Sequence, residues 1–376
     1  MREPIERRAL SLCQASTAVA AGKGRKSSLS RQILTALGLS TALTCLPATA
    51  VLAQDSIAGE LRPAVMSLKA SSVLLLDVAQ AGDRLVAVGS RGHIVYSDDQ
   101  GQTWLQAPVP VRQLLTSVYF ADAQHGWAVG HDSLILHTSD AGASWEVQYR
   151  DPTLEESRAD QDGGLLERPL MDVWFRDTQT GFAIGGYGLF LRTDDGGQTW
   201  EDLTDEIDNP DGFHYNAIGE IAGSGLFMVG EMGTMYRSPD YGDTWEAFDP
   251  YEDVPYDGSL FGVTGTGDEG VVLAWGLRGH MFRSDDFGDS WERVRLTVPG
   301  NGALEATLSS GSVSDDGKLV VVGVGGVVIT SQDRGRTFEV STRPDRVALA
   351  SGKVLEDGSL LLVGQRGAIK AVPAPR

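Results

Sequence analysis

Residues 129–145, VGHDSLILHTSDAGASW, contain the two signals that decide the fold. An apolar stretch that ends at Gly130 is followed by an octet, residues 138–145, of the form S/T-x-D-x-G-x-S/T-W/F. The octet occurs six times, with its aspartates at Asp99, Asp140, Asp195, Asp240, Asp286 and Asp333. A motif that recurs about every 20–50 residues indicates a repeat architecture, and this spacing is typical of four-stranded propeller blades.

The chemistry of the octet predicts a hairpin turn between two short strands. Asp140 can accept hydrogen bonds from turn N–H groups, Gly142 suits a positive φ, and Ser144 can bond the local backbone. A large aromatic residue then starts the next strand and offers apolar surface to the core: Trp104, Trp145, Trp200, Trp245, Trp291 and Phe338. The octet resembles the Asp-box, or bacterial neuraminidase repeat, and we expect its role to be structural.

The apolar stretch ending in glycine gives a second count of the blades. It occurs seven times, at Gly89, Gly130, Gly185, Gly230, Gly276, Gly323 and Gly364, and the seventh copy has no octet after it. We therefore expect an all-β, seven-bladed propeller of four-stranded antiparallel blades, with blades beginning near residues 72, 115, 170, 215, 259, 304 and 347. The last blade lacks one strand, and the N-terminal segment Leu61–Leu68 is the candidate to complete it, since ring closure removes exposed strand edges.

The first 53 residues differ from the repeats. They contain seven Lys or Arg against Glu3 and Glu6, then an apolar core from Ile33 to Leu46 and a small-residue stretch ending at Ala53. This is the layout of a secretory signal, and its apolar core is too short for a stable membrane span. We predict cleavage after Ala53, which leaves residues 54–376 as a single exported propeller domain.

Charge and residue spacing exclude several kinds of partner. The formal net charge is −20, which argues against nucleic acid or anionic lipid, because both require a positive surface. The acidic and histidine residues show no metal-ligand spacing, so we expect no metal and no cofactor. We expect the chain to be a monomer.

One face of the propeller carries the candidate binding residues. In a four-stranded meander the octets share one face, and the turns after the seven glycines share the other with the links between blades. On that second face we select Arg91, Arg278, Arg366, Tyr187 and Trp275 as candidate partner-binding residues, because arginine suits bidentate recognition of carboxylates. The acidic links, above all residues 151–168, lie opposite the arginines in the ring. The alternative that all of these are solvated turn residues stays open.

Two alternatives follow from the Asp-box itself. Sialidase-type glycoside hydrolases carry this repeat, and the three arginines could mimic their substrate carboxylate site. Those enzymes are six-bladed, however, and their early F/Y-R-I-P motif is absent here. A glycan-binding propeller is a further possibility, which an exposed Trp275 would support.

A closer resemblance covers about residues 70–372. The segments Gly126–Gly130, Gly181–Gly186 and Thr193–Trp200 are similar to the repeats of the photosystem II assembly and stability factors, which are lumenal seven-bladed propellers. The resemblance implies a propeller without enzymatic chemistry that binds proteins during assembly of a membrane complex, through an arginine-bearing patch. We therefore expect an assembly, stability or accessory factor for a membrane or envelope protein complex, located in the periplasm or, in a photosynthetic host, in the thylakoid lumen. Residues 151–168 depart from the compact family pattern.

Overall fold

The computed structural model describes residues 61–152, 168–249, 252–300 and 302–371. They belong to one compact unit, Ser56–Arg376, while the predicted signal segment and its cleavage site lie outside the described residues. Within the described ranges no helix is long and apolar enough to cross a membrane.

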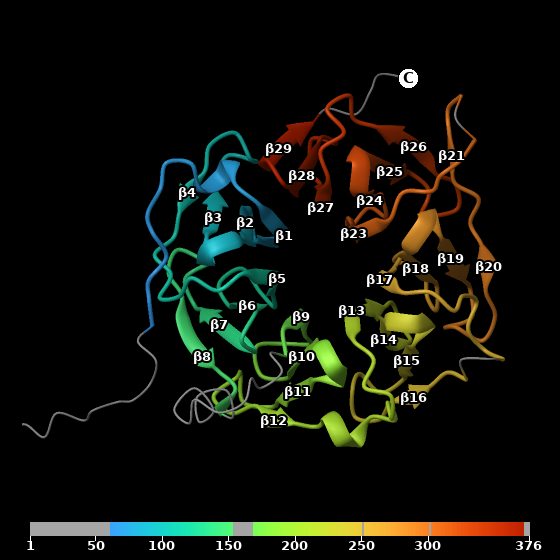
Figure 1. Ribbon diagram of the computed structural model, residues 1–376, viewed down its shortest axis with the longest axis horizontal. Helices are drawn as coiled ribbons and strands as arrows, with labels where there is room; N and C mark the ends of the chain where they lie inside the picture. The colour runs from blue at the N-terminus through green and yellow to red at the C-terminus, as the bar shows by residue number, and fades with distance from the viewer. Residues whose placement is uncertain (1–60, 153–167, 250–251, 301, 372–376) are drawn as a thin grey trace, which may run out of the picture. The chain divides into compact units, whose positions relative to one another are not determined.

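The described chain folds into seven antiparallel sheets arranged as blades around a centre (Figure 1). Within each sheet the strands pair in chain order, and the first strand is the innermost. The strands of blades 1 to 4 are β1 (Leu75–Ala81), β2 (Arg84–Gly89), β3 (Ile94–Ser97) and β4 (Leu105–Gln106); β5 (Leu115–Phe120), β6 (Gly126–Gly130), β7 (Leu134–Thr138) and β8 (Glu146–Tyr149); β9 (Leu170–Phe175), β10 (Gly181–Gly185), β11 (Phe190–Thr193) and β12 (Glu201–Asp202); β13 (Tyr215–Ile221), β14 (Gly225–Gly230), β15 (Met235–Ser238) and β16 (Glu246–Ala247).

Blades 5 to 7 continue the same order, with one additional hairpin. Their strands are β17 (Leu260–Gly265), β18 (Val272–Gly276), β19 (Met281–Ser284) and β20 (Glu292–Arg293); β23 (Leu308–Val313), β24 (Leu319–Gly323), β25 (Val327–Ser331) and β26 (Glu339–Thr342); β27 (Leu349–Val354), β28 (Leu360–Gly364) and β29 (Gly367–Ala371). The hairpin, β21 (Thr297–Val298) with β22 (Gly302–Ala303), lies in the link between blades 5 and 6. The architecture confirms the predicted fold class.

The core lies between neighbouring blades, because each blade packs on both sides. Every residue of β6, β10, β18, β24 and β28 is buried. Trp127 of blade 2 stacks on Phe175 of blade 3, with ring centroids 3.5 Å apart and planes inclined by 10°. Burial on both sides explains why the second strands are continuous apolar runs rather than alternating ones.

The glycine at the end of each second strand is required by a close approach of backbones. A Cβ at Gly130 would collide with the carbonyl oxygen of Leu114, which precedes the first strand of the same blade. The other six glycines meet the equivalent carbonyl in their own blades. The first strand bulges next to this contact, as the register shift between Leu115 and Ser117 shows.

The segment expected to complete blade 7 lies elsewhere. Leu61–Leu68 forms no strand: the Ala64 N–H donates to the Val109 carbonyl at 2.9 Å, and Arg112 Nε donates to the Pro63 carbonyl at 2.8 Å. Ala64 is buried in the core that blades 1 and 2 share. The segment therefore covers the link between blades 1 and 2, and blade 7 has three strands among the described residues. The prediction that Leu61–Leu68 is the closing strand is wrong.

Candidate partner-binding face

The six octets form closed hydrogen-bond networks on one face of the propeller. In blade 2, Asp140 Oδ1 accepts from the Thr138 hydroxyl at 2.7 Å and the Ser144 N–H at 2.9 Å, while Oδ2 accepts from the Ser144 hydroxyl at 2.6 Å. The Thr138 hydroxyl in turn accepts from the Gly142 N–H at 3.0 Å. Two successive residues, Ala141 and Gly142, have positive φ. The turn therefore requires a second residue with left-handed backbone, whereas the sequence indicated only the glycine.

These contacts leave the octet aspartates committed to the turn. The Thr103 hydroxyl donates to Asp99 and, with the Thr103 N–H, lowers the pKa of Asp99 to about 2. The same three-way arrangement recurs at Asp195, Asp240, Asp286 and Asp333. Their structural role is thus what the turn chemistry predicts.

Arginines on the same face connect four of the six octets to the preceding blade. Arg237 of β15 donates to the Phe287 carbonyl in the next octet at 3.2 Å and pairs with Asp289 at 2.6 Å. Arg84 and Arg283 reach the equivalent carbonyls of Ala141 and Arg334, and Arg192 reaches the carbonyl one residue later in its octet, that of Gly242. This role was not predicted from the sequence, although three of the four arginines directly precede an octet.

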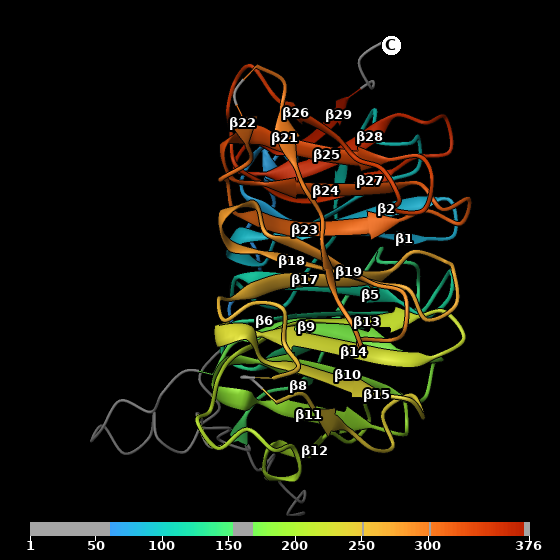
Figure 2. The same ribbon diagram turned by 90° about the vertical axis from the view of Figure 1, so that its right-hand side faces the viewer.

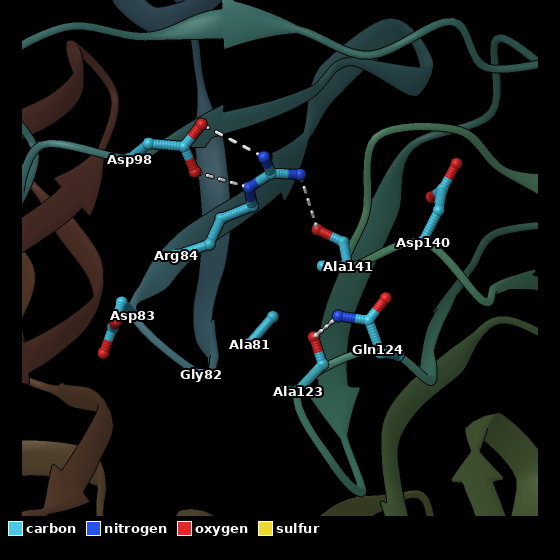
Figure 3. Close-up of a pocket in the computed structure, with 9 residues that line it drawn as sticks. All are labelled: Ala81, Gly82, Asp83, Arg84, Asp98, Ala123, Gln124, Asp140 and Ala141. Carbon is cyan, nitrogen blue, oxygen red and sulfur yellow. Dashed lines mark hydrogen bonds and ion pairs between the residues drawn. The ribbon is translucent and has the colours of Figure 1, made fainter.

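A depression of about 470 Å³ lies on the octet face between blades 1 and 2. Figure 3 shows Arg84 in its wall, bonded on one side to Asp98 and on the other to the Ala141 carbonyl. Arg84, Asp98 and Asp140 already have partners, which leaves Asp83 as the one charged side chain of this lining without one among the described residues, so the depression offers little for recognition.

The opposite face is formed by the turns between the second and third strands (Figure 2). Five of them are single 3-10 turns, η2 (Ser90–Gly92), η3 (Gly186–Gly188), η5 (Glu231–Gly233), η6 (Leu277–Gly279) and η7 (Val324–Gly326). The middle residue of each has left-handed backbone, which directs a side chain outward in four of the five turns; the fifth has Gly325 at this position. Blade 2 reaches the same conformation at Asp132, and the turn of blade 7 carries Arg366.

The three candidate arginines occupy these positions. Arg91, Arg278 and Arg366 are exposed, and no described residue makes a hydrogen bond or an ion pair to their guanidinium groups. Blade 6 has Gly325 at the turn, but Arg346 from the next link lies over it: a Cβ at Gly326 would be 3.1 Å from the Arg346 Cα. We name Arg91, Arg278, Arg346 and Arg366 the basic set. Arg346 was missed because a link residue has no repeat position that would identify it.

Apolar and aromatic side chains occupy the turns of blades 3 and 4. Tyr187 is 42% exposed and Met232 is 53% exposed. The Tyr187 ring meets His214 edge to face, with centroids 4.7 Å apart. The turn face therefore combines unpaired guanidinium groups with exposed apolar surface.

Trp275 does not belong to this face. Its side chain is 1% exposed and packs in the core shared by blades 5 and 6, against Gly262 and Gly311. Those two glycines leave room for the indole between the inner strands. The structure thus excludes Trp275 as a partner-binding residue and removes the feature that favoured a glycan-binding propeller.

Two partly buried carboxylates, Asp77 and Asp172, lie on the inner strands and not on either face. Asp172 accepts from the Ile218 N–H of blade 4 at 3.0 Å and from the Ser117 hydroxyl of blade 2 at 2.8 Å. Burial raises its pKa to about 7 despite these bonds. Asp77 accepts from the Ser117 hydroxyl and the Val118 N–H, so both residues connect blades. Across the described ranges no group of His, Cys, Asp and Glu could hold a metal ion.

The repeat region matches a known protein family. The sequence model described as Photosynthesis system II assembly factor YCF48 matches residues 104–161 and 164–298, more than half of the chain. The chain belongs to this family. The family is described as one of photosystem II assembly factors, and the match confirms the resemblance that the repeats indicate.

Individual relatives match over shorter stretches. The photosystem II stability/assembly factor HCF136 of Cyanidioschyzon merolae, described as chloroplastic, is 38% identical over 60 residues, which cover 15% of this chain and 14% of the relative. The photosystem II assembly lipoprotein Ycf48 of Synechococcus sp. (strain CC9902) is 34% identical over 86 residues, covering 23% and 22%. The matched stretches thus span less than a quarter of these curated relatives.

A solved structure extends the likeness to the whole propeller. The structure described as YCF48 bound to D1 peptide superimposes with a TM-score of 0.60 at 19% identity, and covers 82% of this chain and 95% of the other. At this identity the likeness shows the fold alone.

Proposed function

We propose that this chain is an exported assembly or accessory factor that holds a segment of a membrane or envelope protein against its turn face. The observation that carries the proposal is the basic set, whose exposed guanidinium groups have no hydrogen-bond or ion-pair partner among the described residues. The arginines that join neighbouring blades on the octet face, in contrast, are all paired: Arg84, Arg192, Arg237 and Arg283. Guanidinium groups without internal partners are suited to carboxylates of another protein.

The descriptions of two relatives also support protein binding and export. A YCF48 structure is described with a D1 peptide, and a Synechococcus relative is described as a lipoprotein. A bound peptide requires an open protein-binding surface, and the turn face with the basic set, Tyr187 and Met232 is such a surface. The basic start of the sequence, with its apolar core and small residues up to Ala53, supports export to the periplasm or an equivalent lumen.

A photo-crosslinking experiment tests this proposal. A crosslinking amino acid at Tyr187 should capture one or a few membrane proteins from the host envelope, whereas the same group at Gln102 on the octet face should capture none. Replacing Arg91, Arg278 and Arg366 by Glu should reduce the Tyr187 crosslink at least about tenfold, because charge reversal adds repulsion to the lost pairing.

Arg176→Glu is the matched control, since Arg176 lies in the first turn of blade 3 on the octet face and is also exposed. Equal crosslinking in the triple variant, or equal capture from Gln102, would contradict the proposal.

A further inference from the structure

Among the described residues, no strand pairs with the outer edge of blade 7. Its sheet is β27–β28–β29, whereas the other six blades each have a fourth strand outside the third. A sheet edge has unpaired N–H and C=O groups and accepts a further strand. A ligand that pairs with these groups must be an extended segment of polypeptide.

The side chains of β29 show the effect of the missing strand. Ile369 pairs with Leu362 of β28, which is the register position of Val95, Leu136, Leu191, Tyr236, Phe282 and Ile329 in the other blades. Those residues are at most 4% exposed, while Ile369 is only partly buried. Ala368 differs from its counterparts, such as Ile94 and Met281, in the same way.

The unpaired backbone groups have a defined register. In blades 1, 3, 4 and 5 the carbonyl at the Ala368 position accepts an N–H from beyond the third strand, as in Ala107 to Ile94 at 3.0 Å and Val294 to Met281 at 2.9 Å. No described residue donates to the Ala368 carbonyl. Because strand residues alternate in direction, Lys370 presents its N–H and C=O to the same open edge, and Ile369 bonds toward β28.

The repeats also indicate which side chains the missing strand needs. In five blades the first residue of the fourth strand is glutamate, preceded by Trp or Phe: Glu146, Glu201, Glu246, Glu292 and Glu339. In blades 3, 4 and 5 this glutamate pairs in register with an arginine of the third strand, as Glu246 does with Arg237 at 2.8 Å. Lys370 occupies that arginine position in blade 7 and pairs with Asp357 at 3.0 Å, just as Arg192 pairs with Asp194 at 3.0 Å while Glu201 lies opposite it. An acidic residue after a bulky apolar one therefore complements this edge.

The described N-terminal segment touches β29 only where that strand begins. The Ser71 carbonyl of η1 (Ala70–Ser72) lies against Gly367, as the Leu304 carbonyl lies against Gly279 in a blade that has its fourth strand, and Leu61–Leu68 forms no strand with β29. From Leu61 the chain runs past the outer strands of blades 2 and 1 before it enters β1 (Figure 1). Pro63 and Ala64 are tied to residues 109–112, on the side of blade 1 away from β29.

We propose that the outer edge of β29 takes up an extended segment of the partner protein as the fourth strand of blade 7, with an acidic residue opposite Lys370 and a bulky apolar residue before it. The inference rests on the proposed function in that the occupant belongs to the partner. The edge begins next to Arg366, so the strand continues directly from the basic set on the turn face.

A defined peptide tests the edge without knowledge of the partner. The probe copies residues 336–343 of this chain, RTFEVSTR, which contain β26 and its preceding phenylalanine. Fluorescence anisotropy should show saturable binding to the purified chain, and hydrogen exchange at the Ala368 and Lys370 amides should slow in the complex. Lys370→Pro removes only an outward N–H and should weaken binding at least about tenfold, since proline is tolerated on strand edges.

A charge exchange separates recognition from a loss of folding. The Lys370→Glu variant should bind the probe more weakly than the wild type does. It should bind a matched peptide with the E339K substitution better than the original probe. Unchanged binding in Lys370→Pro and Lys370→Glu, or the absence of saturable binding to the wild type, would overturn the inference. A dimer seen by sedimentation and abolished by Lys370→Pro would also overturn it, because the occupant would then be a second copy.

The two proposals fail separately. If the probe does not bind while the Tyr187 crosslink remains sensitive to the arginine substitutions, only the strand edge is excluded. If the probe binds as described but no envelope protein crosslinks at Tyr187, the edge stands as a strand acceptor and the proposed function fails.

Discussion

The two faces of this propeller are made by the same repeat and differ in what their polar groups bind. On the octet face the aspartates and arginines bond to the turns of their own blade and the next. On the turn face the backbone directs a side chain outward in most blades, and the basic set has no hydrogen-bond or ion-pair partner among the described residues. The difference teaches that one end of each blade stabilises the ring, while the other is available for recognition.

An aromatic residue on each face gives the largest expected contrast. Trp245 packs edge to face on Phe182 and Phe190, with centroids 6.2 and 5.6 Å away, whereas Tyr187 is 42% exposed. Trp245→Ala should lower the free energy of unfolding by about 2–4 kcal/mol, and Tyr187→Ala by less than about 1 kcal/mol. Urea unfolding measures both, and similar losses would contradict the assignment of the two faces.

Two arginines in neighbouring blades should show a smaller difference in their contribution to the free energy of unfolding. Arg237→Ala removes the bonds to Asp289, Glu246 and the Phe287 carbonyl, so unfolding should become easier by about 1–3 kcal/mol. Arg278→Ala should change stability by no more than about 0.5 kcal/mol and should instead reduce the Tyr187 crosslink. A large stability loss in Arg278→Ala would show that this residue serves the fold.

The smallest expected effect is a loss of stability at low pH, which arises on the octet face. The folded pKa of Asp99, about 2, lies below its ordinary value near 4, so its contribution is present above pH ~4 and is lost as the pH falls toward 2. Thr103→Val removes a hydroxyl donor and should raise the pKa of Asp99, which NMR titration measures directly. An unchanged pKa in this variant would contradict the role of the hydroxyl.

Asp172 is the internal control for that titration, since its shift has the opposite sign. Its folded pKa of about 7 lies above the ordinary value, so its contribution is present at low pH and is lost as the pH rises from about 4 through 7. Asp172→Asn should therefore flatten the stability profile between pH 4 and 7 and leave the window between pH 2 and 4 unchanged.

Local sequence chemistry predicts the parts of the site that a single repeat contains. The octet specifies a turn, because its aspartate and hydroxyl residues bond within eight residues of one another. The glycine that ends each second strand marks the turn that follows it, and this regularity alone predicts that Arg91, Arg278 and Arg366 share one face. Arg237 and Arg346 were not recognised because their partners or neighbours lie in the next or preceding blade.

The sequence by itself determined the repeat, the number of blades, the structural octets and the face that carries the arginines, since these depend on contacts within one blade. Only the tertiary structure decided that Trp275 is buried, that Leu61–Leu68 covers the link between blades 1 and 2, and that no described strand pairs with the outer edge of β29. Those outcomes depend on how one blade packs against the next, and a second strand that is buried on both sides gives no sequence signal for the direction of a single side chain.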